Sequence, residues 1–229
     1  MSRTSPAQAD AYPQLHRGFA WQVPARFNIA NVCCRRWAGD AAHARRVAVR
    51  WEREGGEHGV LRYGELGAEA DRLAHALLEL GVRPGDRVAL VLPQRPETAV
   101  ATIAVLQLGA VVVPLSMLFG PDALDYRLQD SGASVAIVDA AAADTVRAVR
   151  GGCPALRHLV VVGGEAAAGE HSWSRLLDNG VATFLPHDTR ADDAAVLIYT
   201  SGTTGPPKGA LIAHRGLIGN LSGFARLTR

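Results

Sequence analysis

Short apolar runs alternate with amphipathic helical patterns along most of this sequence, and no other feature restricts the possible fold as strongly. Residues 87–92 and 194–200 are continuous apolar runs, typical of strands that are buried on both faces of a parallel sheet. Residues 63–80 place leucines and alanines three and four positions apart, which predicts a helix with one apolar stripe. The alternation therefore predicts an α/β fold with a doubly wound, mostly parallel sheet flanked by helices.

The remaining segments extend the same alternation. Further strands are expected at residues 45–51, 110–115, 134–139, 157–163 and 209–214. Further helices are expected at about residues 96–108, 121–132, 141–150, 171–180 and 215–227. The last helical pattern continues towards Arg229 without a cap or a stop signal.

The charge is balanced, and this excludes some partners. The 24 basic and 22 acidic residues give a formal net charge of +2 and are spread along the chain. Such a distribution gives no electrostatic footprint for nucleic acid or for a membrane surface. The first 18 residues lack the apolar core of a secretory signal, and no apolar run is long enough to cross a bilayer. We expect a cytoplasmic protein with no nucleic-acid partner and no membrane insertion.

The three cysteines do not form a recognisable site. Cys33, Cys34 and Cys153 are odd in number and two of them are adjacent, so they fit neither a disulfide framework nor a zinc site. We expect reduced, mostly buried thiols, because nothing nearby marks one of them as a catalytic thiolate. The sequence therefore predicts no metal site.

The segment from Tyr199 to Gly209, YTSGTTGPPKG, directly follows an apolar run expected to be a strand. Its glycines let a ligand approach the main chain closely, and successive backbone N–H groups in such turns form a concave nest for anions. Serine and threonine hydroxyls add donors, and Lys208 adds a positive charge behind two rigid prolines. Because ligands collect beyond the carboxyl ends of strands in open α/β sheets, the segment predicts a polyphosphate site.

Two other interpretations of this segment fit less well. A Walker A loop has four residues between its glycine and the Gly-Lys pair, followed by Ser or Thr and a helix. Here Gly209 follows Lys208 and a strand is expected next. A flexible Gly/Ser/Thr linker rarely joins two buried strands and rarely carries a lysine after a proline pair. Phosphate binding is therefore the preferred interpretation.

The same segment resembles the phosphate-loop signature of the adenylate-forming (AMP-binding) superfamily, which includes acyl-CoA synthetases, luciferases and the adenylation domains of peptide synthetases. Every motif position from Tyr199 to Gly209 is filled. Supporting matches occur, in the family's order, at residues 61–66, 81–90 and 106–139. Residues 25–38 and 114–128 are similar to the short- and medium-chain acyl-CoA synthetase branch, and the resemblance covers about residues 19–229.

The resemblance implies an ATP-dependent ligase that activates a carboxylic acid, with a role in fatty acid metabolism for this branch. The carboxylate attacks the α-phosphate of ATP to give an acyl-adenylate and pyrophosphate, and the thiol of CoA then displaces AMP. ATP, Mg²⁺ and CoA are thus implied. The β- and γ-phosphates, with Mg²⁺ between them, would be held by Thr200, Ser201, Gly202, Thr203, Thr204, Gly205 and Lys208. His214 lies where relatives often carry a histidine, and we expect it to be structural.

The sequence departs from the family in its length, because relatives continue well beyond the phosphate loop and this chain ends at Arg229. We expect residues 1–24 to be a flexible N-terminal extension and residues 25–229 to be the N-terminal part of the large adenylation domain, with the C-terminal lid domain absent. Catalytic residues and metal ligands are expected beyond Arg229 and none within this chain. The acidic residues without a motif are expected to be surface carboxylates: Asp139, Glu165, Glu170 and Asp178.

Two hypotheses of different classes follow. The preferred one is an N-terminal fragment of an acyl-CoA ligase, shortened by an engineered boundary, a frameshift or a premature stop, and inactive without the missing C-terminal part. The alternative is a stand-alone, non-catalytic module that binds nucleotide or phosphate or pairs with another chain. Within the family, an aryl-acid or amino-acid activating enzyme is a further alternative, because the pocket residues that distinguish these enzymes lie mostly beyond Arg229.

Overall fold

The computed structural model describes residues 17, 19–200 and 206–219. The strands are β1 Val47–Glu52, β2 His58–Arg62, β3 Arg87–Val91, β4 Val111–Leu115, β5 Val135–Asp139, β6 His158–Val162, β7 His171–Ser172, β8 Ala194–Thr200 and β9 Lys208–Ala213. The helices are the π-helix η1 Asn31–Arg35, α2 Arg36–Ala38, α3 Tyr63–Glu79, α4 Pro96–Gln107, α5 Pro121–Ser131, α6 Ala140–Arg150 and α7 Trp173–Asn179. Most of the N-terminal extension expected at residues 1–24 lies outside the described residues.

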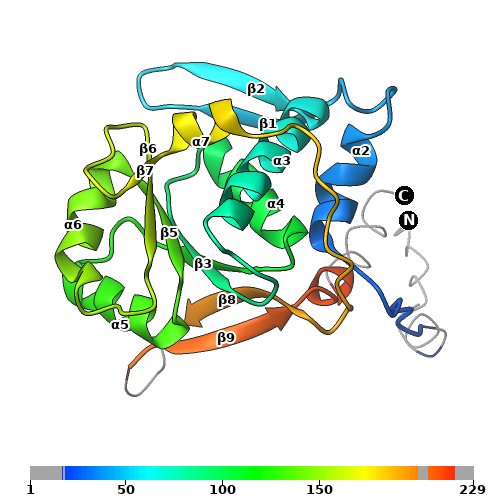
Figure 1. The fold of residues 1–229 in the computed structure, drawn as a ribbon. Coiled ribbons are helices and arrows are strands. Elements are labelled where there is room, and N and C mark those ends of the chain that lie inside the picture. The colour runs from blue at the N-terminus through cyan, green and yellow to red at the C-terminus, as the bar shows by residue number, and fades with distance from the viewer. Residues whose placement is uncertain (1–16, 18, 201–205, 220–229) are drawn as a thin grey trace, which may run out of the picture.

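The main sheet has the strand order β7-β6-β5-β3-β4-β8-β9 (Figure 1). Neighbouring strands from β7 to β8 are parallel, and β9 runs antiparallel to β8. β3 pairs with β4 on one side and with β5 on the other, so the chain winds outwards from β3 in both directions. The doubly wound, mostly parallel sheet expected from the sequence is confirmed.

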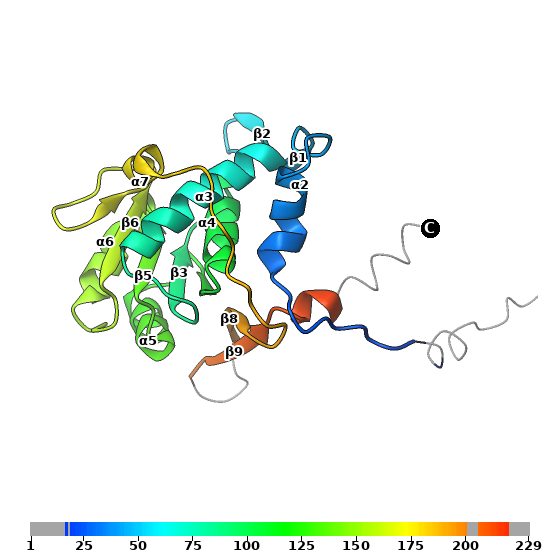
Figure 2. The same ribbon diagram turned by 45° about the vertical axis from the view of Figure 1, so that its right-hand side comes forward.

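Helices lie on both faces of the main sheet (Figure 2). Side chains of the parallel strands alternate between the two cores that these helices cover. In β3, Val88 and Leu90 belong to a core shared with α3, α4 and α7. The intervening Ala89 and Val91 belong to a core shared with α5 and α6. All four side chains are almost completely buried. Burial on both faces explains why these strands are continuous apolar runs rather than alternating ones.

The segment expected as a strand at residues 45–51 forms β1, but β1 does not join the main sheet. It pairs with β2 in a separate antiparallel sheet. The sequence does not predict β2, because His58 and Gly59 interrupt its short apolar pattern. Gly59 makes room for Trp51, since a Cβ atom there would lie 2.6 Å from the indole ring and the ring would have to move.

Local signals in the sequence set several helix ends. Pro96 and Pro121 occupy the first turns of α4 and α5, where a missing N–H group costs no hydrogen bond. α5 ends at Gly132, whose φ of 57° is left-handed and favours glycine. At the start of α6, Asp139 Oδ1 accepts a hydrogen bond of 3.0 Å from the backbone N–H of Ala141. In the described part of the chain, no helix combines the length and the apolar character needed to cross a membrane.

β9 is the edge strand at one end of the main sheet, and it carries exposed apolar side chains. Leu211 is 63% exposed and Ile212 is 36% exposed. Within the described residues, β9 pairs with β8 and with no other strand. Such an edge presents unpaired N–H and C=O groups to any strand that can add to it.

The packing of α3 gives a stability prediction. Leu73 is 0% exposed, whereas Leu78 on the same helix is 39% exposed. We expect Leu73→Ala to lower the free energy of unfolding by about 2–5 kcal/mol, because it removes apolar contacts and leaves a cavity. Leu78→Ala is the matched control and should cost less than about 1 kcal/mol. Urea denaturation followed by circular dichroism measures both, and equal losses would contradict the placement of α3.

Candidate functional site

The loop expected to bind phosphates joins β8 to β9. Because β8 is parallel to β4, its carboxyl end lies on the same side of the sheet as the carboxyl ends of the other parallel strands. Thr200 and Lys208 form the last residue pair of the β8–β9 hairpin, and both are exposed. The structure thus brings together two of the predicted site residues. The other five lie outside the described residues: Ser201, Gly202, Thr203, Thr204 and Gly205.

Lys208 is the single lysine of the sequence, since all the other residues counted as Lys or Arg are arginines. A lysine ammonium is a compact point charge on a flexible stem, whereas a guanidinium is a rigid, planar fork. A flexible point charge can follow the oxygens of a polyphosphate as their positions change during a reaction. A lysine here, in an arginine-rich chain, is therefore consistent with phosphate binding.

The residues that flank the loop between β8 and β9 are hydrogen-bonded to α5 on both sides. Tyr126 Oη donates a hydrogen bond of 3.0 Å to the carbonyl oxygen of Pro207. Tyr199 Oη donates one of 2.6 Å to Asp130 Oδ2, and the rings of Tyr126 and Tyr199 meet edge to face with centroids 6.4 Å apart. Burial, together with the Asp130 carboxylate, raises the pKa of Tyr199, so the phenol remains a hydrogen-bond donor at neutral pH.

Further contacts fix the ring of Tyr199. Gly209 lies opposite Tyr199 in the hairpin. A Cβ atom at Gly209 would lie 3.5 Å from the ring of Tyr199 and 3.0 Å from Leu197 Cδ1. The guanidinium carbon of Arg127 lies 4.1 Å from the ring centroid of Phe119 and 5.7 Å from that of Tyr199. Arg127 is 8% exposed, and its Nε has no hydrogen-bond partner among the described residues. The two ring faces therefore stabilise its buried charge.

The centre of the carboxyl edge, where the connections of β3 and β5 diverge, is filled by an ion network. Arg95 Nε and Nη2 donate to the two carboxylate oxygens of Glu97 at 2.7 and 2.8 Å. Arg95 Nη1 donates to Asp139 Oδ2, at the end of β5, at 2.5 Å. The expectation that Asp139 is a surface carboxylate is wrong, because its side chain is 14% exposed and ion-paired. The hairpin, by contrast, leaves its terminal side chains exposed.

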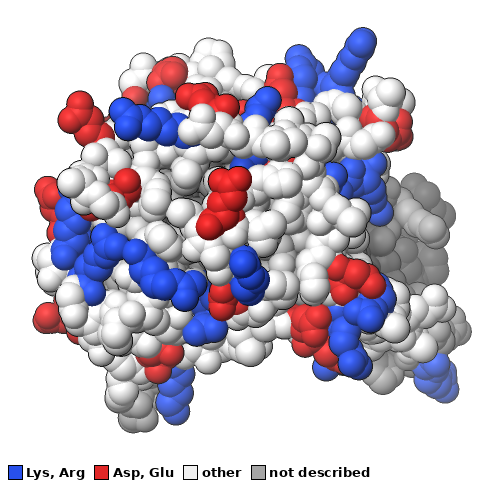
Figure 3. Space-filling view, in the orientation of Figure 1, with Lys and Arg blue, Asp and Glu red and all other residues white. Residues whose placement is uncertain are grey.

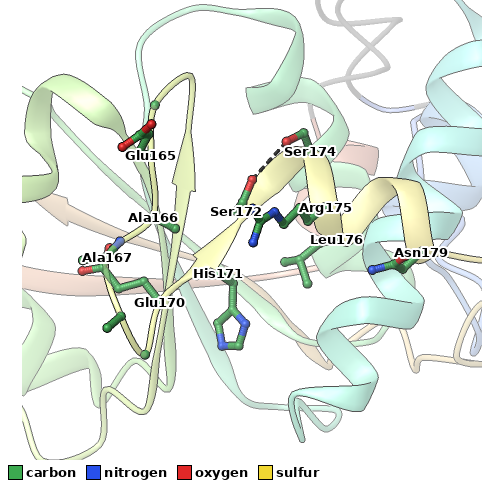
Figure 4. A pocket seen from close by; sticks show the side chains of 13 residues that line it. Glu165, Ala166, Ala167, Glu170, His171, Ser172, Ser174, Arg175, Leu176 and Asn179 are labelled. Carbon is green, nitrogen blue, oxygen red and sulfur yellow. Dashed lines mark hydrogen bonds between the residues drawn. The ribbon is translucent and has the colours of Figure 1, made fainter.

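A hollow of about 880 Å³ lies near the other end of the sheet, between the loop after β6 and α7 (Figure 4). Glu170 contributes to its lining but is fully engaged. Its two carboxylate oxygens accept hydrogen bonds of 2.8 and 2.7 Å from Arg147, and Ala167 N donates another of 2.8 Å. The hydrogen bonds from Arg147 lower the pKa of Glu170 to about 2. Glu170 is thus an ion-paired structural residue and not the free surface carboxylate expected, whereas Glu165 and Asp178 are exposed as expected.

Among the described residues, neither the cysteines nor a cluster of potential metal ligands forms a second candidate site. Those residues contain no group of three or more His, Cys, Asp or Glu side chains that could hold a metal ion. Cys34 and Cys153 are buried and Cys33 is exposed. Burial raises the pKa of Cys34 to about 12, which keeps this thiol protonated.

His214, at the end of β9, is a buried structural residue. It is 0% exposed, and the backbone N–H of Ile29 donates a hydrogen bond of 3.1 Å to its Nδ1. Its backbone N–H donates to the carbonyl oxygen of Asp193 at 3.0 Å. Burial lowers the pKa of His214 to about 4, so the ring is neutral at pH 7. The histidine joins the N-terminal segment to the hairpin.

The surface charges are mixed. Figure 3 shows acidic and basic side chains interspersed on one face of the molecule, with a longer band of basic side chains on its left side. This distribution agrees with the small formal net charge of +2.

Sequence reasoning identified the hairpin and predicted a helix at residues 121–132, but it did not show that this helix, α5, contacts the hairpin. Tyr126 and Asp130 are four residues apart and so project from the same face of α5. That spacing is visible in the sequence, but no sequence signal shows which element the face meets. The contacts of Tyr126 with Pro207 and of Asp130 with Tyr199 join residues 81 and 69 positions apart.

Comparison with known proteins finds a matching family model and similar enzymes. The chain matches the model of the AMP-binding enzyme family over residues 34–229. It is 34% identical over 213 residues to an acetyl-coenzyme A synthetase of Streptomyces coelicolor, covering 86% of this chain and 33% of that protein. It is 41% identical over 162 residues to a feruloyl-CoA synthase of an Amycolatopsis species, covering 70% of this chain and 30% of that protein. The chain thus spans about a third of the length of these relatives.

Solved structures show the same likeness. The anthranilate CoA ligase AuaEII in complex with anthranoyl-AMP aligns with a TM-score of 0.77 and 28% identity, over 84% of this chain and 36% of that one. The acyl-CoA synthetase of Brucella canis aligns with a TM-score of 0.78 and 25% identity, over 93% of this chain and 38% of that one. The likeness covers most of this chain and little more than a third of each neighbour.

Burial of His214 predicts an acid-sensitive fold. Between the ordinary pKa of 6.5 and the folded value of about 4, the unfolded chain takes up a proton that the folded chain does not. Lowering the pH through this window should therefore cost up to about 3 kcal/mol of stability. His214→Asn keeps an acceptor for the N–H of Ile29 but cannot be protonated, so its stability should change less with pH. Urea unfolding at pH 7, 5.5 and 4.5 measures both proteins, and parallel pH profiles would contradict the assignment.

Proposed function

Because the chain belongs to the AMP-binding enzyme family of adenylate-forming ligases, we propose that it provides the phosphate-binding part of an acyl-CoA synthetase. In this reaction a carboxylate oxygen attacks the α-phosphorus of ATP, the bond to the bridging oxygen breaks, and pyrophosphate leaves. The thiol of CoA then displaces AMP from the acyl-adenylate to give a thioester. The observation that carries the proposal is the hairpin that places Thr200 opposite Lys208 at the carboxyl edge of the parallel strands.

We assign the β- and γ-phosphates to the hairpin loop. Its backbone N–H groups and hydroxyls donate hydrogen bonds, and the ammonium of Lys208 offsets part of the phosphate charge. Negative charge accumulates on pyrophosphate as the bond to the α-phosphorus breaks, so fixed donors stabilise the transition state more than bound ATP. The assigned residues are Thr200, Ser201, Gly202, Thr203, Thr204, Gly205 and Lys208.

Mg²⁺ and CoA complete the proposed reaction, but we assign neither of them ligands here. The described residues lack a group of three side chains that could hold a metal ion. We therefore expect Mg²⁺ to arrive with ATP, where its charge would further neutralise the phosphates. The cytoplasm, which supplies ATP and CoA, is the proposed location.

The proposed substrate is a short- or medium-chain fatty acid. Residues 25–38 and 114–128, which resemble that branch, support this choice. The similar proteins named above are an acetyl-coenzyme A synthetase, a feruloyl-CoA synthase and an anthranilate CoA ligase. An aryl acid is therefore the second candidate within the same reaction.

We further propose that residues 25–229 are part of a larger adenylation domain and do not complete the reaction alone. The chain spans about a third of the length of the two relatives named above, so about two thirds of each has no counterpart in this chain. The exposed Leu211 on edge strand β9 supports this proposal, because a larger domain would cover it.

Lys208→Ala tests the phosphate assignment. We expect it to weaken binding of ATP and of inorganic pyrophosphate about ten- to hundredfold, because a charge-assisted contact contributes about 1.5–3 kcal/mol. Isothermal titration calorimetry on the purified chain measures both ligands.

Arg215→Ala is the matched control for Lys208→Ala. It removes the same unit charge from a side chain that is 58% exposed and paired with Asp192. Its dissociation constants should stay within about twofold of the wild-type values, since surface ion pairs contribute little. Unchanged pyrophosphate binding by Lys208→Ala would show that the hairpin is not a phosphate site.

A turnover assay tests the proposal that the chain does not complete the reaction alone. Purified 1–229, supplied with ATP, Mg²⁺ and a panel of short, medium and aryl acids, should release no pyrophosphate above the level without acid. An enzyme-coupled pyrophosphate assay measures this. Acid-dependent release would show that the chain is competent by itself and would name its acid.

A further inference from the structure

We propose that Tyr126 and Asp130 of α5 are positioning residues that hold the two ends of the phosphate-binding hairpin loop. The inference rests on the proposed function of that loop. It adds two residues, from a helix about seventy residues earlier in the chain, that act through the hairpin rather than by touching phosphate.

Each attachment lies next to a residue assigned to phosphate binding. Tyr126 Oη donates to the carbonyl oxygen of Pro207, the residue directly before Lys208. Asp130 accepts from Tyr199, the residue directly before Thr200. The two hydrogen bonds therefore fix the main chain on entry to the loop and on exit from it.

The helix that carries both attachments is a rigid support. Leu124 and Leu128 are 1% and 0% exposed and anchor α5 in the core against the sheet. Tyr126 and Asp130 are one helical turn apart on another face of the helix. The spacing between the two hydrogen bonds is thus set by α5 and not by the loop itself.

The ring of Tyr199 has little freedom to leave this position. It lies across Gly209, meets Tyr126 edge to face, and has the guanidinium of Arg127 5.7 Å from its centroid. Moving the ring would uncover the buried charge of Arg127, which is only 8% exposed. The ring contacts and the hydrogen bond to Asp130 therefore favour one position of the strand end.

A loop whose ends are already fixed loses less conformational entropy when it binds a ligand. The attachments should therefore contribute to affinity for phosphates without contacting them. Removing one attachment should weaken binding while the fold, anchored by the two cores, keeps its stability.

Tyr126→Phe and Asp130→Ala each remove one attachment. We expect each to raise the dissociation constant for inorganic pyrophosphate about two- to tenfold, the net range for one typical hydrogen bond. Asp130→Asn retains an acceptor for the hydroxyl of Tyr199 and should bind nearly as the wild type does. Tyr63→Phe, which deletes the same hydroxyl at the start of α3, is the matched control and should leave binding unchanged.

Calorimetry and thermal melting together decide the outcome. Weakened binding by Tyr126→Phe and Asp130→Ala, with melting temperatures close to those of Tyr63→Phe and Asp130→Asn, supports the inference. Wild-type affinity in both attachment variants overturns it. Equal weakening in Tyr63→Phe also overturns it, because the loss would then reflect general destabilisation.

Hydrogen exchange tests the attachments without a ligand. Backbone amides of Leu197–Thr200 and Lys208–Ala210 should exchange faster in Tyr126→Phe and Asp130→Ala than in the wild type. Unchanged exchange would overturn the inference, whatever the binding results. If the wild type binds no pyrophosphate but these amides respond as expected, the proposed function fails and the attachment stands.

Discussion

Burial of the main sheet on both faces is the constraint on which the rest of the structure depends. Neighbouring strand residues such as Val88 and Ala89 lie in opposite cores, so the strand interiors have no room for polar side chains. A buried polar group without a partner costs free energy, and polar groups therefore collect where strands end. The ion network of Arg95 and the hairpin of Lys208 both lie at such ends.

The centre and the outer end of the sheet's carboxyl edge therefore have different roles. At its centre, Arg95 is paired with both Glu97 and Asp139, so its guanidinium is already fully engaged. At its outer end, β8 turns back as antiparallel β9, which is the arrangement that allows a short connection. The short return places Thr200 opposite Lys208, an arrangement that a long parallel crossover would not produce.

Much of this arrangement could be predicted from the sequence, because the parallel strands and long helices have local patterns. The strand expected at residues 194–200 is β8, and the family motif identified the hairpin end. β2 and the helices of residues 31–38 were not predicted, since they depend on tertiary contacts such as Trp51 over Gly59. The contact between Tyr126 and Pro207 was equally inaccessible, because it depends on how distant elements meet.

The solitary lysine has a practical consequence for experiment. Amine-directed reagents react with lysine side chains and with the α-amino group, and arginine does not compete under mild conditions. Once the α-amino group has been acylated near neutral pH, where the lysine ammonium stays protonated, a fluorophore ester added at higher pH would label this chain at Lys208 alone. The emission of such a dye would report the surroundings of the hairpin directly, with no background from other sites.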